Sequence, residues 1–310
     1  MADIVAIGEP MIEFNQVQPD QPGFLQGFGG DTSNAIIAAA RQGARTAYYT
    51  RVGTDAFGDR LLSLWQAEGV DTRHVQRDAQ AATGVYFVTH GAGGHEFSYL
   101  RAGSAASRMT PSDLPAGAIR QARWLHVSGI SQAISATACD TVFEAIEVAR
   151  HAGARVSYDS NLRLKLWPLA RARAIIRATI GLTDLFLPSL EDAQQFTGLD
   201  DADAIIDWCL QAGARTMVLK LGKDGAMIAT PTLRTRVAGH VVKVVDATGA
   251  GDCFAGALLA RLVLGEPLDL AVRYANAAAA LTTTGFGAVA PIPAQADVTA
   301  FLNRQAATTD

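Results

Sequence analysis

The residues best suited to chemistry lie in the stretch VDATGAGD, residues 245–252. It follows an apolar, β-branched run over 241–245 and precedes a segment rich in alanine and leucine over 253–260, a pattern that predicts a strand, a tight turn and a helix. The first turn of a helix carries unpaired N–H groups and partial positive charge, so it attracts phosphate. Gly249 and Gly251 place no side chain in the way of such a ligand.

Asp252 is the residue of this stretch that a simple phosphate site does not explain, because a carboxylate repels phosphate. One role that requires it is the removal of a proton from a hydroxyl that is about to attack the phosphorus. The alternative is that Asp252 only caps the helix, since aspartate is a preferred capping residue. The motif alone leaves both interpretations open.

Polar residues also follow the predicted strands that end at Asp159 and Lys220. Ligands of parallel sheets collect at the C-terminal ends of the strands, so we expect these residues to share one edge. Arg163 could hold a carboxylate or a phosphate through its planar fork, or could form a salt bridge with Asp159. Gly222 and Gly225 could run beneath a nucleotide or could simply form a β-turn.

Ser189, Glu191 and Asp192 follow a further predicted strand at 185–187. Their oxygen atoms could position a Mg²⁺-bound water at the phosphates. They could equally cap the helix expected at 191–196.

Two glycines, Gly29 and Gly30, precede another predicted helix whose first turn carries Asn34. Paired glycines allow a ligand to approach the backbone closely, so Asn34 could face a polar ligand. A turn followed by a helix N-cap explains these residues about as well.

A β-rich segment near 83–102 interrupts the helix–strand alternation, and we expect it to form a small lid sheet with the segments near 11–28. Tyr86 lies on its first strand, and Tyr99 and Arg101 share a face of its second strand. Such a face could cover a polyhydroxylated anion, although tyrosine is also ordinary in a sheet that packs on both sides.

The remaining strands and helices alternate, which predicts a mainly parallel α/β sheet with helices on both faces, in one domain over 1–310. Strands are expected at 4–8, 46–53, 124–128, 156–159, 185–187, 217–220 and 227–229. Helices are expected near 31–42, 56–68, 135–152, 170–180, 191–196, 201–212, 251–264, 268–284 and 294–305.

Composition narrows the class of protein. The chain has 310 residues, is 49% hydrophobic and 18% charged, and carries a formal charge of −4, which indicates a globular protein and argues against nonspecific nucleic-acid binding. The sequence shows no long apolar run for a membrane span and no signal-like start, so we expect a cytoplasmic protein. The three cysteines are far apart and show no metal-ligand spacing.

The paired glycines with Asn34 and the stretch 246–252 together resemble the two signatures of the ribokinase-like (PfkB) carbohydrate kinase family, and the resemblance spans nearly the whole chain. It implies a ribokinase-like fold, ATP and Mg²⁺ as cofactors, and Asp252 as the base that deprotonates a sugar hydroxyl. It further implies that an anion hole is formed by the backbone N–H groups of Gly249, Ala250 and Gly251.

The same resemblance assigns further roles. The residues expected to contact the sugar are Gly30, Asn34, Tyr86, Tyr99, Arg101 and Arg163. The residues expected to border ATP are Lys220, Gly222, Gly225, Asn276 and Ser189. Expected metal neighbours are Asp192 and Glu191 for Mg²⁺, where the family's Asn-x-x-Glu motif reads SLED, and Asp246 and Thr248 for a monovalent cation such as K⁺.

Within the family, three stretches look like 2-keto-3-deoxygluconate kinases: GGDTSN at 29–34, FSYLRAGSA at 97–105 and DSNLRLKLW at 159–167. This similarity implies phosphorylation of the 6-hydroxyl of 2-keto-3-deoxygluconate to 2-keto-3-deoxy-6-phosphogluconate. Arginines in both the lid and the core suit this substrate, because a buried carboxylate needs a partner and the pairing selects against neutral sugars.

Two other functions remain open. The chain could be another PfkB kinase, such as a fructokinase, ribokinase or nucleoside kinase, or a noncatalytic sugar or nucleotide sensor, against which the intact Asp252 and its glycines speak. Preference between the gluconate- and galactonate-derived epimers rests on one hydroxyl and is not readable from the residues. We also expect a homo-oligomer, a dimer or larger, because the free edges of a lid sheet tend to be covered.

Overall fold

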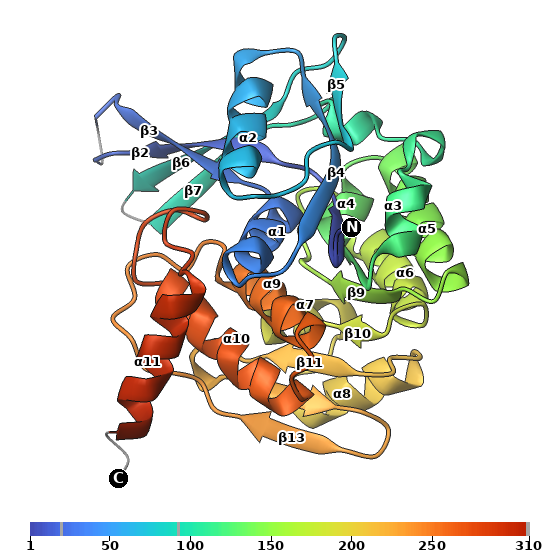
Figure 1. Cartoon of the computed structure of the whole chain (residues 1–310), viewed down its shortest axis with the longest axis vertical. Helices are drawn as coiled ribbons and strands as arrows, with labels where there is room; N and C mark the ends of the chain where they lie inside the picture. The colour runs from blue at the N-terminus through green and yellow to red at the C-terminus, as the bar shows by residue number, and fades with distance from the viewer. Residues whose placement is uncertain (19–20, 92–93, 308–310) are drawn as a thin grey trace.

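The computed structural model describes residues 1–18, 21–91 and 94–307. Within these ranges a nine-stranded sheet is covered by helices on both faces, and a separate four-stranded sheet extends from one side (Figure 1). The predicted α/β architecture, with its small additional sheet, is confirmed. Among the described helices, none is both long and apolar enough to cross a bilayer.

The large sheet places the carboxyl ends of its central strands along one edge. Its strands run, in spatial order, β13 (Arg234–Val237), β12 (Ala226–Ala229), β11 (Met217–Lys220), β10 (Leu185–Phe186), β9 (Arg155–Asp159), β8 (Trp124–Ser128), β1 (Ile4–Ile7), β4 (Thr46–Gly53) and β5 (Val75–Asp78). All neighbours from β11 to β5 are parallel, and β12 and β13 are antiparallel additions. The central strands β1 and β8 are buried along their whole length, as parallel strands between two helical layers must be.

Each face of the large sheet has its own apolar core. One face packs against α1 (Asp31–Arg41), α2 (Ala56–Ala67), α9 (Ala250–Val263), α10 (Leu268–Thr282) and α11 (Gln295–Ala307). The other packs against α3 (Ala116–Gln121), α5 (Ala136–His151), α6 (Leu169–Ile180), α7 (Leu190–Thr197) and α8 (Ala202–Gln211). Short helices complete the set: α4 (Gly129–Ala133), η1 (Ala106–Arg108), η2 (Pro111–Asp113) and η3 (Gly222–Asp224).

Helices α1 and α9 pack unusually close together. A Cβ atom on Gly256 would lie 2.1 Å from the carbonyl oxygen of Ala35, so only glycine permits this approach. The contact sets the first turns of the two helices side by side, with Asn34 on one and Asp252 on the other.

The small sheet has the strand order β3 (Phe24–Gly29), β2 (Met11–Gln16), β6 (Gly84–Gly91) and β7 (Gly94–Leu100). Strands β2 and β6 are parallel, whereas the two outer pairings are antiparallel. Tyr86 pairs with Tyr99, and both pack with Met11, Val88 and Phe97 on one face. The expected partnership of the 11–28 and 83–102 segments is therefore what the structure has.

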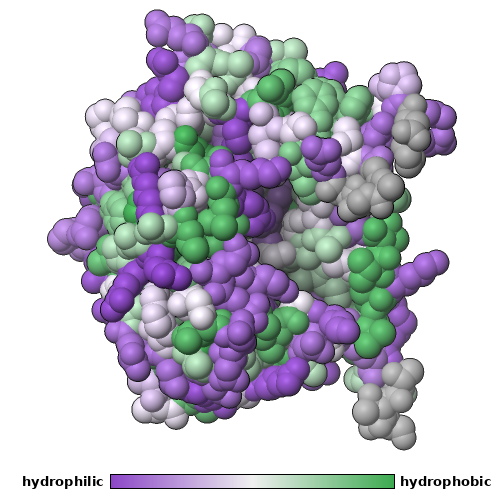
Figure 2. Space-filling model, turned by 180° about the vertical axis from the view of Figure 1, so that it is seen from behind, coloured by the Kyte–Doolittle hydropathy of each residue, from purple (hydrophilic) through white to green (hydrophobic). Residues whose placement is uncertain are grey.

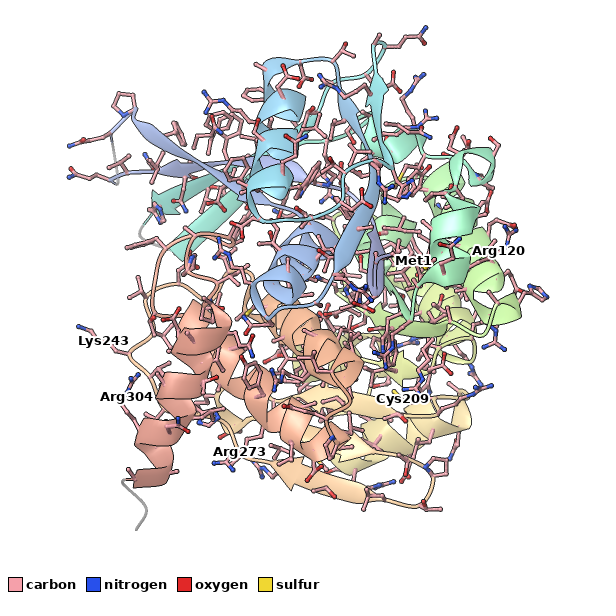
Figure 3. All side chains as sticks on the ribbon, viewed as in Figure 1. Met1, Arg120, Cys209, Lys243, Arg273 and Arg304 are labelled. Atoms are coloured by element: carbon pink, nitrogen blue, oxygen red, sulfur yellow. The ribbon has the colours of Figure 1, made fainter. Side chains whose placement is uncertain are left out.

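The predicted strand over 241–245 is wrong. These residues form no strand, and Val241 and Val244 are 95% and 60% exposed. Lys243, labelled in Figure 3, points away from the body of the molecule. A β-branched run forms a strand only where a partner edge and a packing surface are available, so α9 is entered from an irregular loop instead.

Two edge strands, β5 and β13, were absent from the sequence-based assignment. Both are four residues long and mostly polar, reading VQRD and RTRV. An apolar run is the signal of a buried strand, so short strands at the solvent-facing edges of a sheet escape it.

Candidate active site

A cavity of about 1470 Å³ lies where the C-terminal edge of the large sheet faces the small sheet. Figure 2 shows a recess on this face of the molecule, with hydrophilic residues along one side and paler, more apolar residues along the other. The cavity brings together most of the expected site residues: Gly30, Asn34, Tyr86, Tyr99, Arg101, Arg163, Ser189, Glu191, Asp192, Lys220, Gly222, Asp246, Thr248, Gly249, Gly251 and Asp252. It is not lined by Ala250, Gly225 or Asn276.

Asp252 lies in the first turn of α9 with both carboxylate oxygens hydrogen-bonded. Its Oδ2 accepts from the side-chain amide of Asn34 at 2.8 Å, and its Oδ1 accepts from that of Asn161 at 3.3 Å. The N-cap of α9 is Gly249, not Asp252, and Asp252 makes no capping bond. The interpretation of Asp252 as a simple helix cap therefore does not describe this structure.

The surroundings of Asp252 favour its protonated form. Desolvation by the surrounding protein, followed by the negative charge of Asp31, raises the pKa of Asp252 to about 8, while Asn34 opposes the shift. A carboxylate with a pKa this close to neutrality can both take up and release a proton under working conditions. This is the property required of a general base.

The glycine turn that precedes Asp252 is shaped by close contacts. Gly249 adopts a left-handed conformation with a φ of 77°, and a Cβ there would lie 2.8 Å from the carbonyl oxygen of Ala288. The N–H of Ala250 already donates to the carbonyl of Ala247 at 3.2 Å. Of the three amides expected to form an anion hole, that of Ala250 is thus engaged within the turn. The Gly251 amide lies in the first turn of α9, where helix geometry supplies no partner.

Lys220 is positioned at this turn by Asp159. Their Nζ and Oδ2 atoms are 2.6 Å apart in a largely buried ion pair that joins the ends of β9 and β11. A Cβ on Gly251 would lie only 3.4 Å from the same Nζ. The lysine therefore presents positive charge directly beside the glycine turn.

Arg163 does not form the alternative salt bridge with Asp159, whose partner is Lys220. Its guanidinium donates to the carbonyl of Leu162 at 2.8 Å, and its side chain is exposed on the cavity wall. Among the described residues, Arg163 makes no ion pair with a carboxylate. Lys165, on the same loop, donates to the Phe97 carbonyl of β7 at 3.3 Å and so touches the small sheet.

Arg101 differs from Arg163 because its charge is already balanced. Its guanidinium forms an ion pair with the buried carboxylate of Glu9, with Nε at 2.8 Å from Oε2, and Glu9 also accepts a bond from Ser104 at 2.7 Å. The guanidinium also lies 5.5 Å from the ring centroid of Tyr99. Arg101 is thus fixed in the cavity wall by its own carboxylate partner.

Tyr86 is fixed by a second buried carboxylate, that of Glu13. Its hydroxyl donates to Oε2 of Glu13 at 2.5 Å. The absence of a side chain at Gly29 makes room for it, because a Cβ there would lie 2.4 Å from the tyrosine oxygen. Burial raises the pKa of Glu13, and the bond from Tyr86 opposes that shift.

The glycines after β11 have different surroundings. Gly222 borders the cavity with a φ of 58°, and no atom lies within 4 Å of the place of its missing Cβ. At Gly225 a Cβ would lie 2.1 Å from the carbonyl oxygen of Val237. Asn276 donates to the carbonyl of Ala238 at 3.1 Å. Gly225 and Asn276 therefore shape the loop after β13, and their predicted proximity to ATP remains a prediction.

The predicted Mg²⁺ neighbours take part in local hydrogen bonds. Ser189 caps α7 by accepting from the N–H of Asp192 at 3.1 Å. Oδ2 of Asp192 accepts from the N–H of Leu162 at 2.9 Å, and burial raises the pKa of Asp192. Both residues and Glu191 line the cavity. In the part of the chain that the structure describes, no three His, Cys, Asp or Glu side chains are grouped to hold a metal ion.

Asp246 connects two loops. Its Oδ1 accepts from the N–H of Thr248 at 2.9 Å and from the Thr248 hydroxyl at 2.7 Å, and its Oδ2 accepts from the N–H of Gly287 at 3.0 Å. These bonds engage both carboxylate oxygens within the protein. The monovalent cation site expected at Asp246 and Thr248 remains a prediction.

Comparison with known proteins gives these contacts a context. The sequence pattern of the pfkB family of carbohydrate kinases matches residues 1–295. The chain belongs to this family. The PfkB chain is also 34% identical to fructokinase-2 of Solanum habrochaites over 316 residues, which cover 96% of the chain and 95% of that relative.

Solved structures of similar proteins agree with the fold of this PfkB kinase. A fructokinase from Vibrio cholerae O395, solved in a form with bound fructose, ADP and calcium ion, has a TM-score of 0.89 and 32% identity and covers 97% of this chain and 99% of its own. A putative ribokinase II from E. coli, solved with ATP and Mg²⁺, has a TM-score of 0.90 and 27% identity over 98% of this chain and 100% of its own. The predicted ribokinase-like fold and the predicted PfkB carbohydrate kinase are therefore confirmed. These relatives are named fructokinases or ribokinase, so they support a sugar kinase in general and lend the 2-keto-3-deoxygluconate reading no support.

Sequence reasoning left three residues of this site without an assigned role: Glu9, Asp31 and Asn161. Asn161 donates to both Asp31 and Asp252, each at 3.3 Å, from a backbone with a φ of 32° that is uncommon outside glycine. A signal was present for Asp31, which directly follows the glycine pair, and for Asn161, which directly follows a strand. Glu9 had none, since its partner Arg101 is 92 residues away along the chain.

Proposed function

We propose that this PfkB kinase transfers the γ-phosphate of ATP to the 6-hydroxyl of a sugar acid, 2-keto-3-deoxygluconate. The observation that supports the acid is the presence on the cavity wall of Arg163, whose guanidinium forms no ion pair with a carboxylate of the described residues, although its charge opposes the rise that burial causes in the pKa of Asp192. Lys165 lines the same cavity on the same loop. Transfer of a sugar carboxylate out of water costs free energy unless a cation pairs with it, and Arg163 and Lys165 supply such cations.

The residues at the base of the cavity supply the proton transfer. Asn34 and Asn161 hold the carboxylate of Asp252, which accepts the proton of the acceptor hydroxyl. The freed oxygen forms a bond to the γ-phosphorus as the bond from that phosphorus to the ADP oxygen breaks. The N–H of Gly251 and the Nζ of Lys220 stabilise the negative charge on the transferring group.

The glycine-rich side of the cavity suits a nucleotide. Gly222 leaves open space, and the first turn of α9 together with Lys220 attracts phosphate. Mg²⁺ at phosphoryl-transfer sites is held by one or two carboxylates plus the phosphates, and Glu191 and Asp192 provide carboxylates on the wall. When bound, Mg²⁺ would shield the charge of the phosphates.

A polar acceptor also fits the floor of the cavity. The side-chain oxygen of Asn34 is buried and accepts no hydrogen bond from the described residues, while its nitrogen is fixed on Asp252. A buried acceptor without a hydrogen bond costs free energy unless a bound ligand donates one, and a sugar hydroxyl is such a donor. This supports Asn34 as a sugar contact, the role that the family resemblance implies.

Fructose is the second candidate acceptor, because fructokinase-2 of Solanum habrochaites and the Vibrio cholerae protein are named fructokinases. The same base and glycine turn would serve it. The balanced pair of Arg101 and Glu9 is equally compatible with a neutral sugar. The two candidates differ in whether the charge of Arg163 is used.

An assay of ADP release decides between them. The purified kinase is given ATP and Mg²⁺ with 2-keto-3-deoxygluconate, its galactonate-derived epimer, fructose or ribose, and an Asp252→Asn preparation controls for contaminating kinases. We expect the highest kcat/KM for one of the two acids. A higher kcat/KM for fructose than for either acid would replace the proposed substrate by fructose, and no turnover of any sugar would refute the proposal.

A further inference from the structure

Asp31, the first residue of α1, has one carboxylate oxygen that accepts no hydrogen bond of normal geometry from the residues that the structure describes. The residue is only 7% exposed and lines the cavity. Its Oδ2 accepts from the side-chain amide of Asn161 at 3.3 Å. Its Oδ1 is buried and accepts no hydrogen bond of normal geometry from the described residues.

This arrangement costs free energy unless a ligand supplies a donor. Burial raises the pKa of Asp31, although the hydroxyl of Ser128, the N–H of Thr32 and the charge of Arg101 favour its ionised form. A buried acceptor without a donor lowers the stability of the protein, because nothing compensates the loss of its hydrogen bonds to water. Natural proteins contain few such groups, and those at the wall of a binding cavity are satisfied when the ligand supplies the donor.

The position of Asp31 relative to Asp252 specifies which donor that would be. The same nitrogen of Asn161 lies 3.3 Å from an oxygen of each carboxylate, so the two acids flank one point on the cavity floor. We therefore expect a sugar whose reacting hydroxyl binds Asp252 to bring a neighbouring hydroxyl within reach of Asp31. No such pairing exists for a substrate with a single hydroxyl.

We propose that Asp31 is a specificity-determining residue whose Oδ1 accepts a hydrogen bond from a secondary hydroxyl of the acceptor, one or two carbons from the hydroxyl that is phosphorylated. The inference rests on the proposed role of Asp252 and holds for an acid or a neutral sugar. For 2-keto-3-deoxygluconate the hydroxyl in question is that of C5 or C4. Inversion at C4 distinguishes the two epimers, so Asp31 bears directly on the choice between them.

A purely structural role for Asp31 makes a different prediction. If the carboxylate only anchors Asn161, its removal lowers the turnover of every acceptor by the same factor. If it reads a hydroxyl, its removal lowers the turnover of the parent sugar and leaves that of the analogue without that hydroxyl nearly unchanged. The ratio of the two kcat/KM values therefore separates the roles.

The experiment measures kcat/KM for the best acceptor and for its 4-deoxy and 5-deoxy analogues, in the wild type and in Asp31→Ala. A hydrogen bond to a charged group is worth about 1.5–3 kcal/mol, so we expect the wild type to prefer the parent over one analogue by roughly 10- to 150-fold. In Asp31→Ala this preference should fall to within about threefold. An unchanged ratio in the variant, or a wild type indifferent to both hydroxyls, would overturn the proposal.

Two further proteins keep the test decisive. Asp31→Asn keeps the shape of the side chain and removes its charge, so it should lower the ratio by a smaller factor than Asp31→Ala. It takes the place of the alanine variant if that variant does not fold. Asp201→Asn removes an exposed carboxylate that caps α8, and it should leave the ratio at the wild-type value. If fructose proves to be the best acceptor, the same ratios are measured with its deoxy analogues, so failure of the proposed acid substrate is distinguishable from failure of this inference.

Discussion

The floor and the rim of the cavity are built on different principles. The floor consists of Asp31, Asn34, Asn161 and Asp252, which come from three separate segments and are tied together by side-chain hydrogen bonds. The rim carries cations on loops, where Arg163 is exposed and, among the described residues, donates a hydrogen bond to a backbone carbonyl. We therefore expect proton transfer to depend on the interlocked buried network, and recognition of a substrate carboxylate to depend on rim side chains that can be exchanged singly.

Removal of the base should produce the largest effect. General acid–base catalysis contributes about 10²–10⁴ in rate, so Asp252→Asn should lower kcat by a factor of this order. The dissociation constant of the sugar, measured by calorimetry without ATP, should change by less than about threefold, because asparagine keeps the shape of the group. Near-normal kcat would assign the proton transfer to another residue.

The rim should respond in KM and in substrate preference. Arg163→Ala should lower kcat/KM for 2-keto-3-deoxygluconate by roughly 10- to 100-fold, since a charged hydrogen bond is lost, and should leave a neutral sugar within about threefold. Arg171→Ala on the exposed face of α6 is the matched control and should change neither value. Equal losses of kcat/KM with both sugars would show that Arg163 does not bind the substrate carboxylate.

The floor carboxylates should also determine how kcat/KM depends on pH. Because burial and the charge of Asp31 raise the pKa of Asp252 to about 8, kcat/KM should increase with pH and level off above that value. Asp31→Asn removes the repulsion, so the rising limb should move to lower pH. A profile that is flat from pH 6 to 9 would contradict the raised pKa.

The smallest effect is on stability. The pKa of Asp252 in the folded state, about 8, lies above its ordinary value of 3.8, so its ionisation opposes folding. Stability is complete below the lower value and is lost as the pH rises towards the upper one. Asp252→Asn should therefore raise Tm at pH 8 by roughly 2–4 °C or more and leave it nearly unchanged at pH 4. A decrease of Tm at pH 8 would show that the hydrogen bonds of Asp252 outweigh its desolvation.

The same contrast explains how much could be predicted from the sequence. The glycine turn and Asp252 were found because their chemistry is contained in eight consecutive residues. The central strands were found because burial on both faces leaves a continuous apolar run. Features of this kind are local, and a single sequence records them directly.

Contacts between distant segments were not predictable in this way. Nothing near Arg101 in the sequence shows that Glu9 balances its charge, and nothing near Asp31 shows that Asn161 binds it. The error at 241–245 has the same origin, because the residues favour a strand but no strand pairs with them. Pairing across the chain is a property of the packed molecule and must be seen there.

One small gap between two helices governs more than its own packing. Gly256 lies one turn inward from Asp252, and the bare backbone there touches Ala35, one residue from Asn34. Even a single methyl group at this spot would wedge α1 and α9 apart and pull the amide away from the acid that it steadies. The position of the Asp252 carboxylate thus depends on Gly256, a residue that does not line the cavity.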